Sequence, residues 1–247
     1  MKKRLLTLVV AMSAAGVILA LPAQASHSWN GYHWARTANP FTLKVVDSNT
    51  PDWDDNLNLA LSDWSVSSVL DLTKDASDDS TRARKQCRMV SGQVRSCNAS
   101  YGFNGWLGLA SINISGSHIT QGTAKMNDSY LASSSYNETN RQHVMCQEIG
   151  HDFGLGHQDE SGADLNTCMD YADALDNPSP NAHDYAQLES IYSHPDGSTT
   201  ITSLPDAAPS WAPATQRSRT VYVDQLADGS ELVTFVFWAN PIRGWNG

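Results

Sequence analysis

The alternation of apolar and polar residues predicts a strand, a helix and a second strand in the first third of the chain. Residues 41–47 alternate and are rich in β-branched side chains, which is typical of a strand. Residues 69–73 favour another strand. Between them, residues 51–65 predict a helix, because large apolar side chains recur at three- and four-residue spacing and form one buried face: Trp53, Leu57, Leu61 and Trp64. This order is the start of an α/β unit.

The same patterns predict two more strands and then two more helices in the middle of the chain. Their ranges are 106–114, 119–126, about 141–153, and 181–192. Thr139 or Asn140 is the expected N-cap of the first of these helices, and Gly154, which has no Cβ, is expected to end it. Strands and helices mix along the chain, so the predicted fold class is α/β (α+β).

The first 25 residues have the pattern of a secretory signal peptide. Three basic residues at 2–4 precede an apolar run over 5–21, and Ala23-Gln24-Ala25 provides the small residues of a cleavage site. An uncleaved membrane anchor is the alternative. No later segment is apolar over a length that spans a bilayer. We therefore expect a secreted, extracellular protein that begins at Ser26 and has no membrane partner after cleavage.

The C-terminal part predicts a linker followed by a β-hairpin. Residues 196 to about 216 are rich in Ser, Thr, Pro and Ala and show little periodicity. Residues 220–226 and 231–238 flank Asp228-Gly229, a strong hairpin signal. A lone hairpin is only marginally stable, so we expect it to dock on the main domain. An adhesive module is the other interpretation of this hairpin.

The predicted domain plan therefore has three parts. It consists of a signal peptide over 1–25, a main domain over 26–196, and a linker with the hairpin over 197–247.

The charge balance limits the possible partners. The chain has 16 Lys and Arg against 26 Asp and Glu, a formal charge of −10. Removing the three basic residues of the expected signal peptide leaves 13 against 26, or −13. An acidic surface argues against a nucleic-acid partner, which needs a basic footprint. It weakly favours Ca²⁺, whose ligands are carboxylates and carbonyls. We expect a monomer.

Four cysteines in a secreted chain predict two disulfides, with three possible connectivities. Cys87 and Cys97 lie ten residues apart in a polar, Gly-containing segment, where a bond would close a hairpin-like loop. Cys146 and Cys168 then pair by elimination. That second bond would tie the helix over 141–153 to the segment around Met169.

Residues 147–157, with the sequence QEIGHDFGLGH, place several metal-binding side chains close together. Residues four apart on a helix project from the same face, so Gln147 and His151 point the same way, with Glu148 beside them. Gly154 lets the backbone leave the helix sharply, because a residue without a Cβ tolerates such a turn. His157 is then expected to return toward His151.

This segment resembles the zinc signature of the metzincin metallopeptidases, H-E-x-x-H-x-x-G-x-x-H, with Gln147 in place of the first histidine. The required methionine follows at Met169 in the turn Cys168-Met169-Asp170-Tyr171. The resemblance, closest by size to the matrixins, implies a twisted mixed sheet with a backing helix, an active-site helix, a Met-turn and a C-terminal helix. It also implies an antiparallel edge strand that receives substrate, which we place near 119–126.

The glutamine is the one departure from the signature. Its amide oxygen can bind zinc, but it is a weaker ligand than imidazole. His143 is a rival on the same face, yet it lies eight residues from His151, or about 12 Å along a helix. We therefore expect Gln147, His151 and His157 as ligands and His143 as a residue around the site, at the surface, or near the helix start. His183 and His194, in or after the last predicted helix, are expected to be surface or core residues. The other histidines have no ligand-spaced partner: His27, His33 and His118.

The resemblance implies a Zn²⁺-dependent endopeptidase that acts on protein or peptide substrates. Glu148 would be the general base that takes a proton from water. Tyr171 matches a tyrosine that serves astacins and serralysins as a zinc ligand and transition-state donor, and the alternative is a tyrosine packed in the turn. The rival function is a non-catalytic secreted binding or inhibitory protein on the same scaffold. Ca²⁺ is a candidate second ion, because the chain is acidic.

Overall fold

The computed structural model describes residues 26–75, 78–172, 175–201, 215–216 and 218–239. The expected signal peptide over 1–25 and residues 202–214 of the expected linker lie outside this part of the chain. Within it, no helix is long and apolar enough to cross a membrane.

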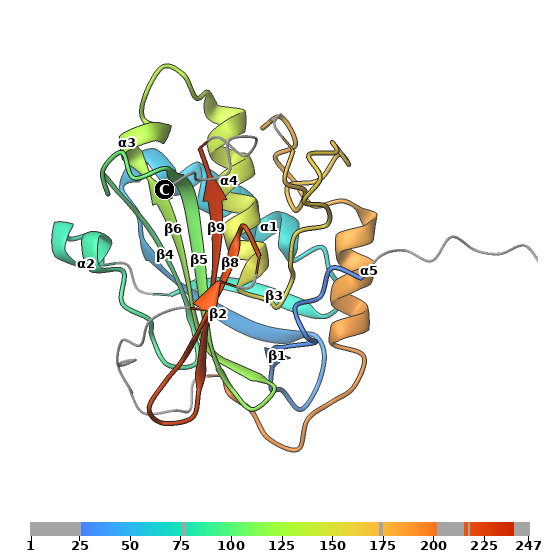
Figure 1. The fold of residues 1–247 in the computed structure, drawn as a ribbon. Helices are drawn as coiled ribbons and strands as arrows, with labels where there is room; N and C mark the ends of the chain where they lie inside the picture. The colour runs from blue at the N-terminus through green and yellow to red at the C-terminus, as the bar shows by residue number, and fades with distance from the viewer. Residues whose placement is uncertain (1–25, 76–77, 173–174, 202–214, 217, 240–247) are drawn as a thin grey trace, which may run out of the picture.

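The protein has a mixed α+β fold built on one sheet, as the fold class predicts (Figure 1). Over the described residues the sheet has nine strands, and eight of them follow the order β3-β2-β4-β6-β5-β9-β8-β7, while β1 pairs with β6. The strands are β1 His33–Trp34, β2 Phe41–Ser48, β3 Leu70–Asp75, β4 Val94–Ala99, β5 Trp106–Ser115, β6 His118–Asn127, β7 Thr215–Gln216, β8 Val221–Gln225 and β9 Glu231–Trp238.

The sheet changes from parallel to antiparallel at β6. The pairs β2–β3, β2–β4 and β4–β6 are parallel, which confirms the predicted strand–helix–strand unit. β5 pairs antiparallel with β6 on one side and with β9 on the other. β9 then pairs antiparallel with β8, so the predicted hairpin exists and continues the main sheet.

The helical segments connect the strands. They are the 3-10 turn η1 Pro51–Trp53 and the helices α1 Asp54–Trp64, α2 Thr81–Gln86, α3 Asp128–Leu131, α4 Glu138–His151 and α5 Ala182–Ile191. The two longest, α1 and α4, pack together behind the sheet (Figure 1). Trp64 is fully buried there, and its indole Nε1 donates a hydrogen bond to Cys146 O at 3.0 Å. The apolar face predicted for α1 therefore covers α4.

Both disulfides form as predicted. Cys87 bonds Cys97, and Cys146 bonds Cys168. The first disulfide joins the end of α2 to β4, because Cys87 directly follows that helix and Cys97 lies in the strand. The sequence patterns did not predict β4. The reason is that Val94–Ala99 is polar and short, although buried within the sheet.

The predicted position of the edge strand is wrong. Residues 119–126 belong to β6, which lies between β4 and β5. β5 is the outer strand of the main-domain part of the sheet, and β9 pairs along it from Trp106 to Ile114. Both β5 and β6 have strand-like patterns, and only the pairing partners reveal which of them lies outermost.

Candidate metal centre

Helix α4 positions the centre, and its start is fixed by local hydrogen bonds. Asn137 is the N-cap instead of the predicted Thr139 or Asn140. Its side chain accepts from the Asn140 amide at 3.0 Å, and the Asn140 side chain accepts from the Asn137 amide at 2.9 Å. These bonds satisfy amides that have no partner within a helix. The helix ends at His151, two residues earlier than predicted, and Gly154 follows at φ +90°.

Tight packing brings the Met-turn against α4. A Cβ added to Gly150 would lie 2.5 Å from Met169 Sδ, so only glycine allows this approach. The Cys146–Cys168 disulfide holds the same two segments together one residue before the methionine. Met169 is completely buried.

The structure brings His151 and His157 together. Their Nε2 atoms lie 3.2 Å apart. His151 Nδ1 donates to Leu155 O at 2.8 Å, and His157 Nδ1 faces Glu160 Oε1 at 3.2 Å. Because these oxygens only accept, the Nδ1 atoms carry the protons and both Nε2 lone pairs face each other. Burial, and then the neighbouring His157, hold the pKa of His151 well below its usual range.

Two facing lone pairs fit a shared zinc ion. Zinc–nitrogen bonds of about 2.0–2.1 Å in a tetrahedral site place two nitrogens about 3.3 Å apart. The His151 and His157 nitrogens already have close to this separation. The hydrogen bonds to Leu155 O and Glu160 are of the kind that orient a metal-bound imidazole.

Gln147 is held in one orientation beside them. Its Nε2 donates to Cys168 O and Asp170 O, each at 2.7 Å, and this pair of acceptors fixes which end is the amide nitrogen. The Oε1 atom is buried and has no hydrogen-bond partner among the described residues. An unpartnered buried carbonyl is costly, and a cation would satisfy it. The donor set of Gln147, His151 and His157 therefore fits zinc.

Glu148 is a buried carboxylate against β5. The side chain is completely buried, and neither of its oxygens has a hydrogen-bond partner in the part of the chain that is described. A Cβ added to Gly108 on β5 would lie 2.2 Å from Glu148 Oε1. Burial raises the pKa of Glu148 well above its ordinary value, the Asp152 carboxylate adds to the rise, and the Ala110 backbone opposes it. The burial of this side chain therefore disfavours its charged form.

Tyr171 lies against His157. Its ring centroid lies 5.0 Å from that of His157. Its hydroxyl accepts a hydrogen bond from the backbone amide of Trp238 on β9 at 2.9 Å. Burial raises the pKa of Tyr171, so the hydroxyl stays protonated and available as a donor.

The C-terminal hairpin covers the centre, which sequence reasoning did not predict. The ring of Phe235 on β9 stacks on His151, and Phe237 packs against Tyr171. At the base of the hairpin, Thr220 donates to Glu160 Oε1 at 2.6 Å. His151 and Glu148 are therefore almost completely excluded from solvent.

His143 does not lie at the surface, which was one of the three positions expected for it. It is fully buried, its ring centroid lies 5.6 Å from that of Phe237, and its two nitrogens have no described hydrogen-bond partner. Burial lowers the pKa of His143 to about 4. Among the described residues it is not part of any group of three metal-binding side chains within 4.8 Å of one another.

Two other groups, each of two histidines and one aspartate, meet in the structure without any sequence spacing that predicts them. One contains His27, His183 and Asp184, and the other contains His33, His118 and Asp196. Their members are far apart along the chain, so no spacing rule reveals them.

Comparison with protein-family models and with curated proteins gives no match for this chain.

Proposed function

We propose that this protein is a secreted zinc-dependent endopeptidase, similar to the metzincins, in which Gln147, His151 and His157 hold the ion. The observation that carries the proposal is the pair of Nε2 atoms 3.2 Å apart at the end of helix α4, which also carries the buried and unpartnered carboxylate of Glu148. A structural zinc site does not need such a carboxylate, whereas hydrolysis does. The two disulfides agree with an oxidising compartment.

The side chains divide the work of peptide hydrolysis. Zinc, when bound, would polarise the scissile carbonyl and lower the pKa of water. Glu148 accepts a proton from the attacking water and returns it to the leaving amine, and its raised pKa suits this role. Tyr171 donates a hydrogen bond from its hydroxyl to the oxyanion that develops on the carbonyl.

A protein or peptide substrate would bind in extended form along β5. Gly108 on this strand lies directly against Glu148, so a chain paired with β5 passes the base. Strand addition supplies backbone hydrogen bonds without demanding a particular sequence. In this structure β9 holds that edge, from Trp106 to Ile114. The proposed activity therefore requires β9 to leave β5 at least transiently.

Zinc content and hydrolysis of casein by the chain from residue 26 test the proposal together. We expect bound zinc, and casein cleavage that disappears in Glu148→Ala while the zinc remains. The Gln147→His variant provides a matched comparison, because it restores the usual donor. A protein that binds no zinc at this centre and cleaves nothing, with or without the Gln147→His change, would contradict the proposal.

A non-catalytic binding protein on the same scaffold is the second candidate. The observation that favours it is the closed centre, with Phe235 on His151 and Trp238 N bonded to Tyr171. Zinc bound at His151 and His157 without any Glu148-dependent cleavage, even when the hairpin is weakened, would favour this function over the first.

A further inference from the structure

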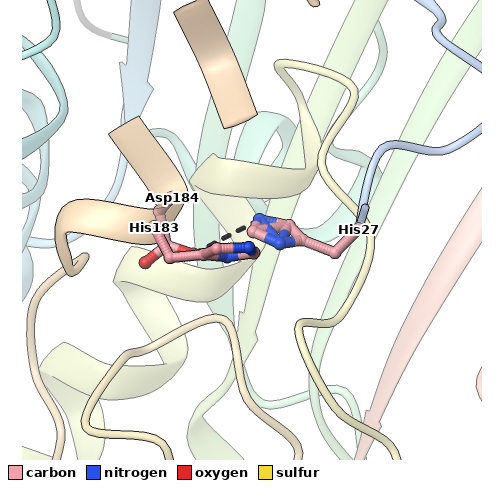
Figure 2. A group of neighbouring side chains, drawn as sticks. All are labelled: His27, His183 and Asp184. Carbon is pink, nitrogen blue, oxygen red and sulfur yellow. Dashed lines mark ion pairs between the residues drawn. The ribbon is translucent and has the colours of Figure 1, made fainter. Parts of the chain in front are cut away.

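A second cluster of metal-binding side chains lies beside the candidate centre, between the N-terminal segment and α5. His27 comes from the segment before β1, and His183 and Asp184 come from the first turn of α5. Figure 2 shows the three side chains pointing toward one another from these two elements. One ligand atom from each residue lies within 4.8 Å of the others.

The possible ligand atoms of the cluster are buried and lack hydrogen-bond partners. His27 and Asp184 have side chains exposed by only 2% and 0%. Both ring nitrogens of His27, Nδ1 of His183 and Oδ1 of Asp184 have no hydrogen-bond partner among the described residues. Asp184 Oδ2, by contrast, accepts from Thr167 Oγ1 and from the Asn181 amide. The carboxylate is thus fixed by one oxygen and presents the other to the histidines.

A simple ion pair does not account for this arrangement. His27 Nε2 lies 3.3 Å from Asp184 Oδ1, as in a histidine–carboxylate pair. That pair leaves Nδ1 of His27 and Nδ1 of His183 buried and without a described hydrogen-bond partner. One ligand atom of each histidine and one of Asp184 lie within 4.8 Å of one another, so a single cation can contact all three residues.

We propose that His27, His183 and Asp184 form a second, structural zinc site. Two imidazoles and one carboxylate are ordinary zinc ligands, and the bonds of Asp184 Oδ2 to Thr167 and Asn181 provide the orientation that metal-bound carboxylates receive. The site is separate from the candidate centre and does not depend on the proposed peptidase activity.

The cluster of His33, His118 and Asp196 serves as a contrast. There Arg36 already supplies the positive charge, since its Nη1 lies 2.7 Å from Asp196 Oδ2. Both His33 and His118 share the other oxygen of that carboxylate. A resident guanidinium satisfies Asp196, so this second group needs no metal.

The proposed site joins two segments, and a backbone hydrogen bond connects it to a third. His27 lies in the N-terminal segment, and His183 and Asp184 begin α5. The backbone oxygen of His27 also accepts a hydrogen bond from the amide of Gly156, next to His157. Zinc at the cluster would therefore anchor the segment before β1 against the loop that carries a ligand of the candidate centre.

Metal content and thermal stability of single variants test this site. We expect the chain from residue 26, saturated with zinc and freed of loose metal, to hold one zinc ion more than His183→Gln or His27→Gln. Both variants should also lose most of the rise in Tm that added zinc gives the unmodified protein. His194→Gln, at a histidine whose side chain is 55% exposed, is the matched control and should keep the full zinc content.

A His157→Gln variant separates the two sites. It should lose the zinc of the candidate centre and keep the zinc of the cluster, and the combination with His183→Gln should lose both. If folded His183→Gln and His27→Gln, checked by circular dichroism, hold as much zinc as the unmodified protein, the inference is overturned. A loss of zinc in these two variants but not in His157→Gln would support the cluster and count against the proposed function.

Discussion

The aromatic ring of Phe235 lies flat on the imidazole of His151, with 4.2 Å between ring centroids and 4° between planes. These residues are 84 positions apart, and β9 brings them together by pairing with β5. The same strand places Phe237 against Tyr171. The C-terminal hairpin therefore covers the candidate centre. It also occupies the edge of β5 along which a substrate strand would pair.

Weakening this cover should increase peptide hydrolysis. Replacing a buried Phe by Ala typically costs about 3–5 kcal/mol, and each 1.4 kcal/mol changes a population about tenfold. We expect Phe235→Ala to raise the rate of casein cleavage at least about tenfold and to lower Tm. Thr234→Ala is the matched control, because Thr234 bonds Ser111 through its hydroxyl and does not cover His151. Equal rates for Phe235→Ala and the unmodified protein would show that the hairpin does not limit access.

Removing the base should abolish hydrolysis but not metal binding. General acid–base groups typically contribute about 10²–10⁴-fold to rate. We expect Glu148→Ala to reduce cleavage by at least about 100-fold, because Glu148 is the carboxylate that lies against Gly108 of β5. Zinc content, measured by mass spectrometry of metals, should not change. Cleavage that persists at the original rate would rule out Glu148 as the base.

Changing the unusual ligand should tighten zinc binding. Imidazole is a stronger zinc ligand than an amide oxygen, so Gln147→His is expected to lower the Kd for zinc. The substitution also removes the two hydrogen bonds to Cys168 O and Asp170 O, which offsets part of the gain. Competition with a chromophoric chelator measures the Kd. An unchanged Kd would indicate that Gln147 does not bind the metal.

The contact between Gly108 and Glu148 leaves no space for a methyl group. A Cβ at Gly108 would lie 2.2 Å from Glu148 Oε1 and 2.7 Å from its Cδ. We expect Gly108→Ala to displace the carboxylate and so to lower kcat. Overpacking should also lower the free energy of unfolding by about 1–3 kcal/mol. At Gly197 an added Cβ meets nothing within 4 Å, so Gly197→Ala is the matched control. An unchanged kcat in Gly108→Ala would show that hydrolysis does not depend on the position of the Glu148 carboxylate against Gly108.

Acid should destabilise the metal-free protein through His143. Burial lowers the pKa of this residue to about 4, while the Asp164 charge opposes the shift. An ordinary histidine has a pKa near 6.5. Below about pH 6.5 the unfolded chain binds a proton that the folded chain does not. The free energy of unfolding therefore falls by on the order of 3 kcal/mol as the pH falls from about 6.5 to about 4.

Urea unfolding at about pH 7 and about pH 5 measures this dependence. His143→Leu should lose less stability between the two pH values than the unmodified protein. His194→Gln, at an exposed position, should behave like the unmodified protein. An equal pH dependence in all three proteins would contradict the assignment to His143.

Local sequence patterns determined most of the helices and strands and the approach of His151 to His157. The spacing of Trp53, Leu57, Leu61 and Trp64 predicts α1, and all four side chains are buried. The spacing in 147–157 brings His151 and His157 together, because a helix and a turn after it act over a few residues. Whether zinc occupies the centre stays a prediction.

Only the tertiary structure decided which strand is outermost, what covers it, and which distant side chains meet. β5 and β6 are equally strand-like, so their patterns do not reveal that β6 is internal and that β9 pairs with β5. Likewise, His27 meets His183 and Asp184 across more than half of the chain. Periodicity reports which face of an element is buried, whereas the partner that buries it is chosen by packing among residues far apart in sequence.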